Sequence, residues 1–154
     1  MTEPFIWPEQ FHLLNRIASQ KPVVHCITNY VTARDVANLL LAAGASPIMA
    51  DHEQEVEEIA RISQALVLNL GTFKGSSMPA MMKAGKMAAS LGHPIVLDPV
   101  GVGVSSLRME AALKLLRETN CTAIRGNVSE IMALADRLLL KEEPLSLGEK
   151  GVDA

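Results

Sequence analysis

The chain has 154 residues, of which 49% are hydrophobic and only 3% aromatic, and its formal net charge at pH 7 is −3. This length accommodates one domain with a sizeable core, and the weak acidity gives no electrostatic reason to expect nucleic acid or a membrane surface as a partner. The sequence shows no secretory signal and no apolar run of the roughly 20 residues that span a bilayer. Cys26 and Cys121 form neither a zinc-binding pair nor a disulfide framework, so we expect a cytoplasmic protein.

Short apolar runs alternate with helical patterns along the chain. The first helical pattern has its apolar stripe at Phe11, Leu14, Ile17 and Ala18, and later helices are expected to begin at Thr32, Asp51, Ser77, Ser105 or Ser106, and Asn127. The apolar runs between them predict five strands, at 23–28, 46–49, 65–70, 94–97 and 122–125. Because apolar strands separated by helices are typical of a parallel sheet, we expect an α/β fold with a mostly parallel sheet and helices on both faces.

Two charged residues end the last two predicted strands, at the edge where open parallel sheets bind their ligands. The guanidinium of Arg125 could clamp phosphate oxygens, or it could simply be solvated. Asp98 precedes a turn, 99–103, whose glycines would let the backbone approach a ligand closely. The alternative is that the Asp98 carboxylate only accepts hydrogen bonds from the amides of this turn.

The residues from Asn127 to Glu130 have two compatible interpretations. They form a capping box, in which Asn127 at the N-cap and Glu130 three residues later satisfy the first amides of a helix. A carboxylate in the first turn of such a helix could also hold the water shell of a magnesium ion. No P-loop occurs, and no dinucleotide fingerprint, since its third glycine position holds Ser106.

Residues at or just after the ends of the first three predicted strands offer further ligand contacts at the same edge. Asn29 could hydrogen-bond a small polar ligand or be a turn residue before a helix, and Met49 belongs to the core or lines an apolar pocket. Gly71 and Thr72 offer a backbone amide and a hydroxyl.

Five segments together resemble the hydroxyethylthiazole kinases of the ribokinase-like superfamily. They are HCITNYVT at 25–32, AAGASPIM at 42–49, LNLGT at 68–72, DPVGVG at 98–103 and IRGNVSE at 124–130. The resemblance runs from about residue 22 to 134, and the last segment carries the N-x-x-E pattern of the superfamily. It implies a three-layer α/β/α fold and phosphorylation of the hydroxyl of 4-methyl-5-(2-hydroxyethyl)thiazole, with Mg²⁺ and ATP, in thiamine biosynthesis and salvage.

The resemblance also implies roles for the substrate-binding residues. Met49 would contact the thiazole, with Asn29, Gly71 and Thr72 near it. The family is usually trimeric, with the thiazole pocket between subunits. We therefore expect a homo-oligomer that binds the thiazole alcohol and ATP, with neither nucleic acid nor a membrane as a partner.

At the phosphate end of the site, the resemblance implies that Arg125 binds ATP phosphates. Asp98 and Glu130 would hold magnesium, and Asn127 would support these cofactor-binding residues. A magnesium ion and an arginine would together offset negative charge on the transferring phosphoryl group.

The chain departs from the family pattern in two ways. Val102 and Val104 replace smaller residues in the glycine turn. The family is also longer, and its second half carries the glycine-rich anion hole, the catalytic base and most of the adenine pocket. We therefore expect residues 1–154 to be the N-terminal portion of a single ribokinase-like kinase domain, incomplete at its C-terminal side, without the anion hole or the base, and inactive or impaired alone. The alternatives are a non-catalytic or split-enzyme subunit that needs a second chain, and a ribokinase-like kinase for another small alcohol.

Overall fold

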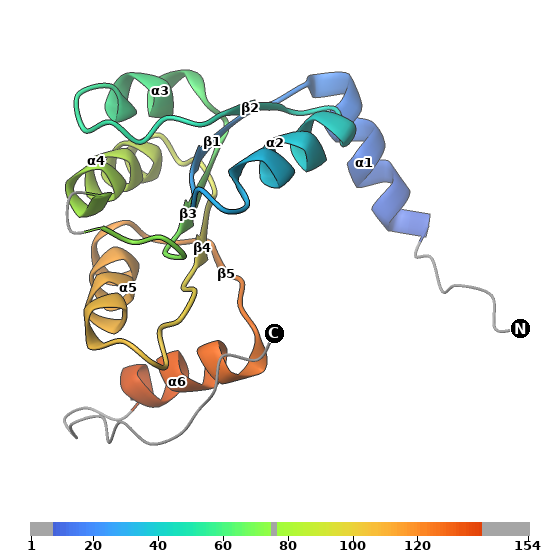
Figure 1. The fold of residues 1–154 in the computed structure, drawn as a ribbon. Helices are drawn as coiled ribbons and strands as arrows, with labels where there is room; N and C mark the ends of the chain where they lie inside the picture. Colours follow the sequence, from blue (N-terminus) through green and yellow to red (C-terminus); the bar gives the residue numbers. More distant parts are fainter. Residues whose placement is uncertain (1–7, 75–76, 140–154) are drawn as a thin grey trace, which may run out of the picture.

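The computed structural model describes residues 8–74 and 77–139 of the chain. Helices and strands alternate throughout these residues (Figure 1). The strands are β1 (Val23–Ile27), β2 (Ser46–Ile48), β3 (Ala65–Asn69), β4 (Ile95–Asp98) and β5 (Ala123–Ile124). The helices are α1 (Pro8–Gln20), α2 (Ala33–Ala42), α3 (Val56–Ile62), α4 (Ser77–Ser90), α5 (Ser106–Glu118) and α6 (Val128–Leu139). No helix in these residues is long and apolar enough to cross a membrane.

The five strands form one sheet in the order β2-β1-β3-β4-β5, and every pairing within it is parallel. The predicted α/β fold with a parallel sheet is therefore confirmed. The chain adds β2 on one side of β1 and then adds β3 on the other side. This reversal creates a crevice at the carboxyl ends of β1 and β3, which is where open α/β sheets bind ligands.

Both faces of the sheet carry helices, because successive strand residues point to opposite sides. Leu66 and Leu68 of β3 join the main core, which also contains residues of α3, α4, α5 and α6. Ala65 and Val67, at the alternate positions, pack on the other face against a smaller cluster formed with α1 and α2. Figure 1 shows α1 and α2 on one side of the sheet and α3, α4 and α5 on the other.

The sheet is less covered at β5 than at its centre. Arg125 and Thr122 donate backbone hydrogen bonds to β4, to Leu97 O at 2.9 Å and Ile95 O at 2.8 Å. The two residues of β5 itself are exposed, and the cluster under α1 and α2 includes residues of β1 and β3 but none of β4 or β5. Within the described part of the chain, the sheet face that α1 and α2 cover at β1 and β3 is therefore not covered by them at β5.

The start of one helix and the capping hydrogen bond of another differ from the sequence-based expectation. The helix predicted from Asp51 begins only at Val56, because the chain first forms a turn in which the amides of Glu55 and Val56 donate to His52 O, at 3.0 and 3.2 Å. Thr32 occupies the N-cap position of α2 as predicted, but its side chain makes no capping hydrogen bond to the helix. Its hydroxyl donates instead to Asn29 Oδ1, at 3.1 Å.

Candidate functional site

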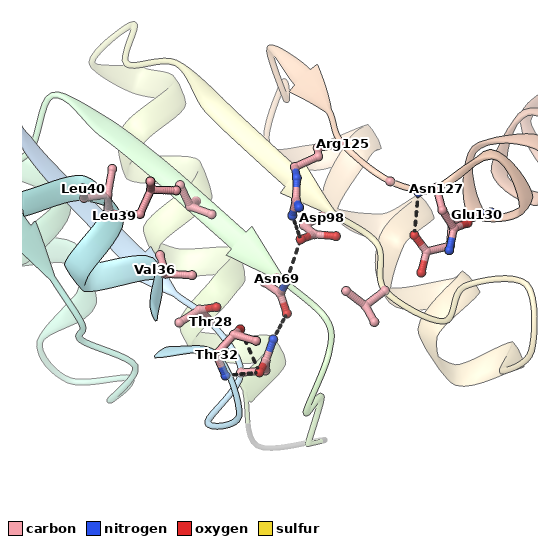
Figure 2. Close-up of a pocket in the computed structure, with 14 residues that line it drawn as sticks. Thr28, Thr32, Val36, Leu39, Leu40, Asn69, Asp98, Arg125, Asn127 and Glu130 are labelled. Atoms are coloured by element: carbon pink, nitrogen blue, oxygen red, sulfur yellow. Dashed lines mark hydrogen bonds and ion pairs between the residues drawn. The ribbon is translucent and has the colours of Figure 1, made fainter. Parts of the chain in front are cut away.

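A cavity of about 730 Å³ lies at the carboxyl ends of the strands. One wall is apolar and comes mainly from α2. The opposite wall is polar and comes from the last residues of β3 and β4 and from the segments that follow β1, β4 and β5 (Figure 2). The lining residues are Thr28, Asn29, Thr32, Val36, Leu39, Leu40, Val67, Asn69, Asp98, Val100, Arg125, Gly126, Asn127 and Glu130.

A continuous chain of hydrogen bonds crosses the polar wall, and we call it the polar relay; it consists of Thr32, Asn29, Asn69, Asp98 and Arg125. Both the amide and the hydroxyl of Thr32 donate to Asn29 Oδ1, at 2.9 and 3.1 Å. Asn29 Nδ2 donates to Asn69 Oδ1 at 3.0 Å, and Asn69 Nδ2 donates to Asp98 Oδ2 at 2.8 Å. Arg125 Nη1 donates to the same carboxylate oxygen at 2.6 Å. The relay therefore connects residues at or just after the carboxyl ends of β1, β3, β4 and β5, in the order in which these strands lie in the sheet (Figure 2).

Asp98 is the buried charge of this site, with 7% of its surface exposed. Burial raises the pKa of its carboxyl group, and the Glu130 carboxylate contributes in the same direction. The Arg125 guanidinium and the Asn69 amide oppose this shift but do not cancel it, since the Arg125 side chain is itself 78% exposed. A buried carboxylate whose ionised form is disfavoured, in a cavity, is typical of a functional site.

Glu130 links the turn after β4 to the start of α6. The predicted capping box is confirmed, since Glu130 N donates to Asn127 Oδ1 at 2.8 Å and Asn127 N donates to Glu130 Oε2 at 3.1 Å. The other carboxylate oxygen, Oε1, accepts a hydrogen bond from Gly101 N at 2.9 Å. Gly101 has a φ of +70°, a conformation that favours glycine and lets the turn present its amide to this oxygen.

Asp98 and Glu130 suit a magnesium ion that keeps most of its water shell. The described residues contain no cluster of three or more His, Cys, Asp or Glu side chains that could form an all-protein metal cage. Magnesium in proteins is commonly bound by one or two carboxylates together with substrate phosphates and water. Among the described residues none donates to Asp98 Oδ1, and each Glu130 oxygen accepts one amide and retains a second lone pair. The donor set therefore fits the ion.

The structure brings together only some of the residues that the sequence suggested. Asn29, Asp98, Arg125, Asn127 and Glu130 line one cavity, whereas the other three candidates do not line it. Two of these three lie next to the relay: Gly71 N donates to Asn69 Oδ1 at 2.7 Å, and Thr72 Oγ1 accepts from Tyr30 N at 3.3 Å. The third candidate is Met49, which follows the edge strand β2 and is 39% exposed.

Two further residues hold the site and were not singled out from the sequence. Asn69 forms the centre of the polar relay, and a polar residue that ends an apolar strand is the signal that could have identified it. Arg108 of α5 joins two loops, since Nη1 donates to Val100 O at 2.9 Å and Nη2 to Gly71 O at 2.8 Å. Arg108 lies within an ordinary helical pattern, so the sequence carried no signal for it.

Comparisons with known proteins identify relatives of this chain. A family model described as the hydroxyethylthiazole kinase family matches residues 14–154. The chain is 53% identical over 144 residues to a hydroxyethylthiazole kinase of Clostridium acetobutylicum, covering 92% of the chain and 49% of that relative. It is also 53% identical over 125 residues to one of Desulfovibrio desulfuricans, covering 81% of the chain and 44% of the relative.

A solved structure supports the same assignment. The hydroxyethylthiazole kinase protein of Pyrococcus horikoshii OT3 matches with a TM-score of 0.77 and 44% sequence identity, over 80% of this chain and 48% of that one. The chain thus spans about half the length of the curated relatives it matches. On the family match, the sequence identities and the shared fold, this chain belongs to the hydroxyethylthiazole kinase family.

Proposed function

We propose that the protein is part of a kinase that catalyses the ATP-dependent phosphorylation of the hydroxyl group of 4-methyl-5-(2-hydroxyethyl)thiazole, a step of thiamine biosynthesis and salvage. The observation that carries this proposal is the polar wall of the cavity. It combines the Asp98–Arg125 pair with Asn127 and Glu130 at the carboxyl edge of the sheet, in a chain of this kinase family. Phosphoryl transfer depends mainly on positioning and on neutralising negative charge, and this wall offers both.

The phosphate end of the site consists of Arg125, Asp98, Glu130 and Asn127. Only Nη1 of Arg125 is used by Asp98, so its exposed guanidinium keeps donors with which it can bind ATP phosphates in a fork geometry. Asp98 and Glu130 would hold magnesium, which when bound offsets negative charge on the phosphates. Asn127 orients Glu130 by accepting a hydrogen bond from its backbone amide.

The alcohol end of the site consists of Asn29, Gly71, Thr72 and Met49. We propose that Met49 contacts the thiazole ring from a neighbouring subunit of a homo-oligomer, a trimer, in the cytoplasm, and that the other three residues lie near the ring. The position of Met49 supports this arrangement, because it is partly exposed and does not line the cavity that contains Asn29. A polarisable thioether at an interface is well suited to a planar heterocycle.

We further propose that the 154 residues alone bind ligands but turn over little or no substrate. The curated relatives are about twice as long as the region they share with this chain. The polar wall described above would then require residues that correspond to the other half of those relatives, from the same or a separate chain, to complete phosphoryl transfer.

Ligand titration followed by NMR of methyl-labelled methionines tests the substrate assignment. The thiazole alcohol should shift one methionine signal, and Met49→Ala should remove that signal. The matched ligand control is 5-ethyl-4-methylthiazole, which lacks the hydroxyl, and ribose tests the alternative of another small alcohol. Binding of ribose in preference to the thiazole alcohol would reject the substrate assignment.

Nucleotide binding measured by calorimetry tests the phosphate end. We expect Arg125→Ala to weaken binding of Mg-ATP at least about tenfold, because a charge-assisted hydrogen bond contributes about 1.5–3 kcal/mol. The matched control is Arg61→Ala, at an exposed position on α3 outside the cavity, which should leave binding unchanged. Equal effects of the two substitutions would contradict the proposed role of Arg125.

A further inference from the structure

Asn69 has no role in the proposed chemistry, yet its side chain hydrogen-bonds to the site residues on both sides of β3, Asn29 and Asp98. It is the last residue of β3, next to the point where strand order reverses, and only 9% of its surface is exposed. Its side chain takes part in three hydrogen bonds: with Asn29 after β1, with Asp98 at the end of β4, and with Gly71 in the loop that follows β3. Figure 2 shows the hydrogen bond to Asp98.

The orientation of the Asn69 amide is fixed by its partners. Oδ1 accepts from Asn29 Nδ2 at 3.0 Å and from Gly71 N at 2.7 Å, while Nδ2 donates to Asp98 Oδ2 at 2.8 Å. A reversed amide would place Oδ1 against a carboxylate oxygen and Nδ2 against two donors. Because all these groups are buried or partly buried, each unmade hydrogen bond would carry a desolvation cost.

The space around Asn69 also leaves it no alternative position. A Cβ atom at Gly71 would lie 2.8 Å from Asn69 Oδ1 and 2.8 Å from Asn29 Nδ2, so the loop backbone packs directly on the pair of amides. On the other side, the Asp98 carboxylate is fixed by Arg125, at 2.6 Å. The Asn69 side chain therefore sets the spacing between the Gly71 amide and the Asp98 carboxylate.

We propose that Asn69 is a positioning residue that holds the alcohol-binding loop in a fixed position relative to the phosphate-binding edge of the site. Its oxygen orients the Gly71 amide and Asn29, and its NH₂ group orients the Asp98 carboxylate. The names of the two ends rest on the proposed function, but the spacing that Asn69 imposes does not.

Two substitutions separate the two halves of this side chain. Asn69→Asp retains an oxygen for Gly71 N and Asn29 but removes the donor to Asp98 and adds a negative charge beside it. Asn69→Leu keeps the branched shape and the number of side-chain heavy atoms and removes both halves. The matched control is Asn38→Asp, the same chemical change at an exposed position of α2 that does not line the cavity.

Amide hydrogen exchange measured by NMR reports on the oxygen of Asn69, and Mg-ATP affinity measured by calorimetry reports on its NH₂ group. We expect Asn69→Leu to accelerate exchange of the Gly71 amide about tenfold or more, the change that corresponds to losing a hydrogen bond of about 1.4 kcal/mol, and to weaken nucleotide binding. Asn69→Asp should keep the Gly71 amide protected and still weaken nucleotide binding about tenfold. Asn38→Asp should change neither.

The internal reference is the amide of Leu66, which donates to Pro94 O at 3.0 Å at the opposite end of β3. If Asn69 only stabilised the fold, its substitution would accelerate exchange of the Leu66 and Gly71 amides together. Asn69→Leu and Asn69→Asp would then not differ in their effect on Gly71 exchange and nucleotide binding. The proposal is overturned if Gly71 exchange in Asn69→Leu matches the wild type, or if Asn69→Asp loses Gly71 protection while binding nucleotide normally. If Asn69→Leu does not fold, the Asn69→Asp result decides alone. Failure of the wild-type chain to bind nucleotide would count against the proposed function, while the exchange data would still test Asn69.

Discussion

Replacement of Gly71 by alanine tests the geometry of the polar relay without requiring any catalytic activity. The added Cβ would lie 2.8 Å from Asn29 Nδ2, 2.8 Å from Asn69 Oδ1 and 3.0 Å from Asn29 Cβ. Because Gly71 does not have a positive φ, its backbone conformation does not disfavour alanine. The cost of the substitution is therefore the steric contact of the added Cβ. Both asparagines are buried and bonded to one another, so neither can move aside without breaking their 3.0 Å hydrogen bond.

The size of the effect follows from three contributions. Overpacking a tight site costs about 1–3 kcal/mol, and loss of the Asn29–Asn69 hydrogen bond adds about 1 kcal/mol. Alanine also restricts the unfolded chain, which returns about 0.4–1 kcal/mol. We therefore expect Gly71→Ala to lower the free energy of unfolding by about 1–3.5 kcal/mol.

Urea denaturation of the chain measures this difference, with Gly103→Ala as the matched control. Gly103 lies in a neighbouring loop at the same sheet edge and also lacks a positive φ, but its Cβ would lie 3.4 Å from Ala133 Cβ, an ordinary contact. That substitution should change the free energy of unfolding by less than about 1 kcal/mol. If Gly71→Ala and Gly103→Ala have the same free energy of unfolding, the loop does not pack on the two asparagine side chains as described.

Three further substitutions have defined outcomes in the same denaturation assay. Burial raises the pKa of Asp98 above its ordinary value of 3.8, so ionisation of this carboxyl group lowers the free energy of unfolding as the pH rises from 3.8 to the raised pKa. Asp98→Asn should reduce this loss of stability and should also weaken nucleotide binding. An unchanged pH dependence of stability in the variant would argue against this role of Asp98. Arg108→Lys should lower the free energy of unfolding by about 1–2 kcal/mol, because an ammonium group cannot bridge the two carbonyls that the guanidinium joins. Amide hydrogen exchange should also accelerate in residues 99–104. Exchange at the wild-type rate in these residues would exclude a role of Arg108 in holding the two loops together. Gly85→Ala should destabilise by about 1–3 kcal/mol even though alanine favours helix, since its Cβ would meet Thr119 Cγ2 at 2.5 Å; a stabilised variant would contradict this packing.

The strands and their polar ends could be predicted because the signal is local. Each strand is a short apolar run, and parallel pairing brings the following residues to one edge whatever the strand order. Asp98 and Arg125 were therefore expected at the same edge, and they form an ion pair. The start of α3 was placed too early, because the turn around His52 uses backbone hydrogen bonds that leave no pattern in the side chains.

The connections within the site could not be predicted in the same way. The contact from Asn69 to Asp98 requires β3 and β4 to be neighbours, and the contact from Asn69 to Asn29 requires β1 on the other side. The sequence predicted strands but not this order. Arg108 reaches its two carbonyls only because the loops after β3 and β4 approach each other, which is a tertiary property.

We have proposed that this chain supplies the phosphate-binding and alcohol-binding wall of a thiazole-alcohol kinase. The most direct test is a chimaera in which this chain replaces the 49% of the Clostridium acetobutylicum relative that it matches. The measurement is transfer of the terminal phosphate of ATP to 4-methyl-5-(2-hydroxyethyl)thiazole. We predict clear transfer by the chimaera and its loss in the Asp98→Asn variant; a folded chimaera that phosphorylates only other alcohols, or transfers equally well with Asp98→Asn, would contradict the claim.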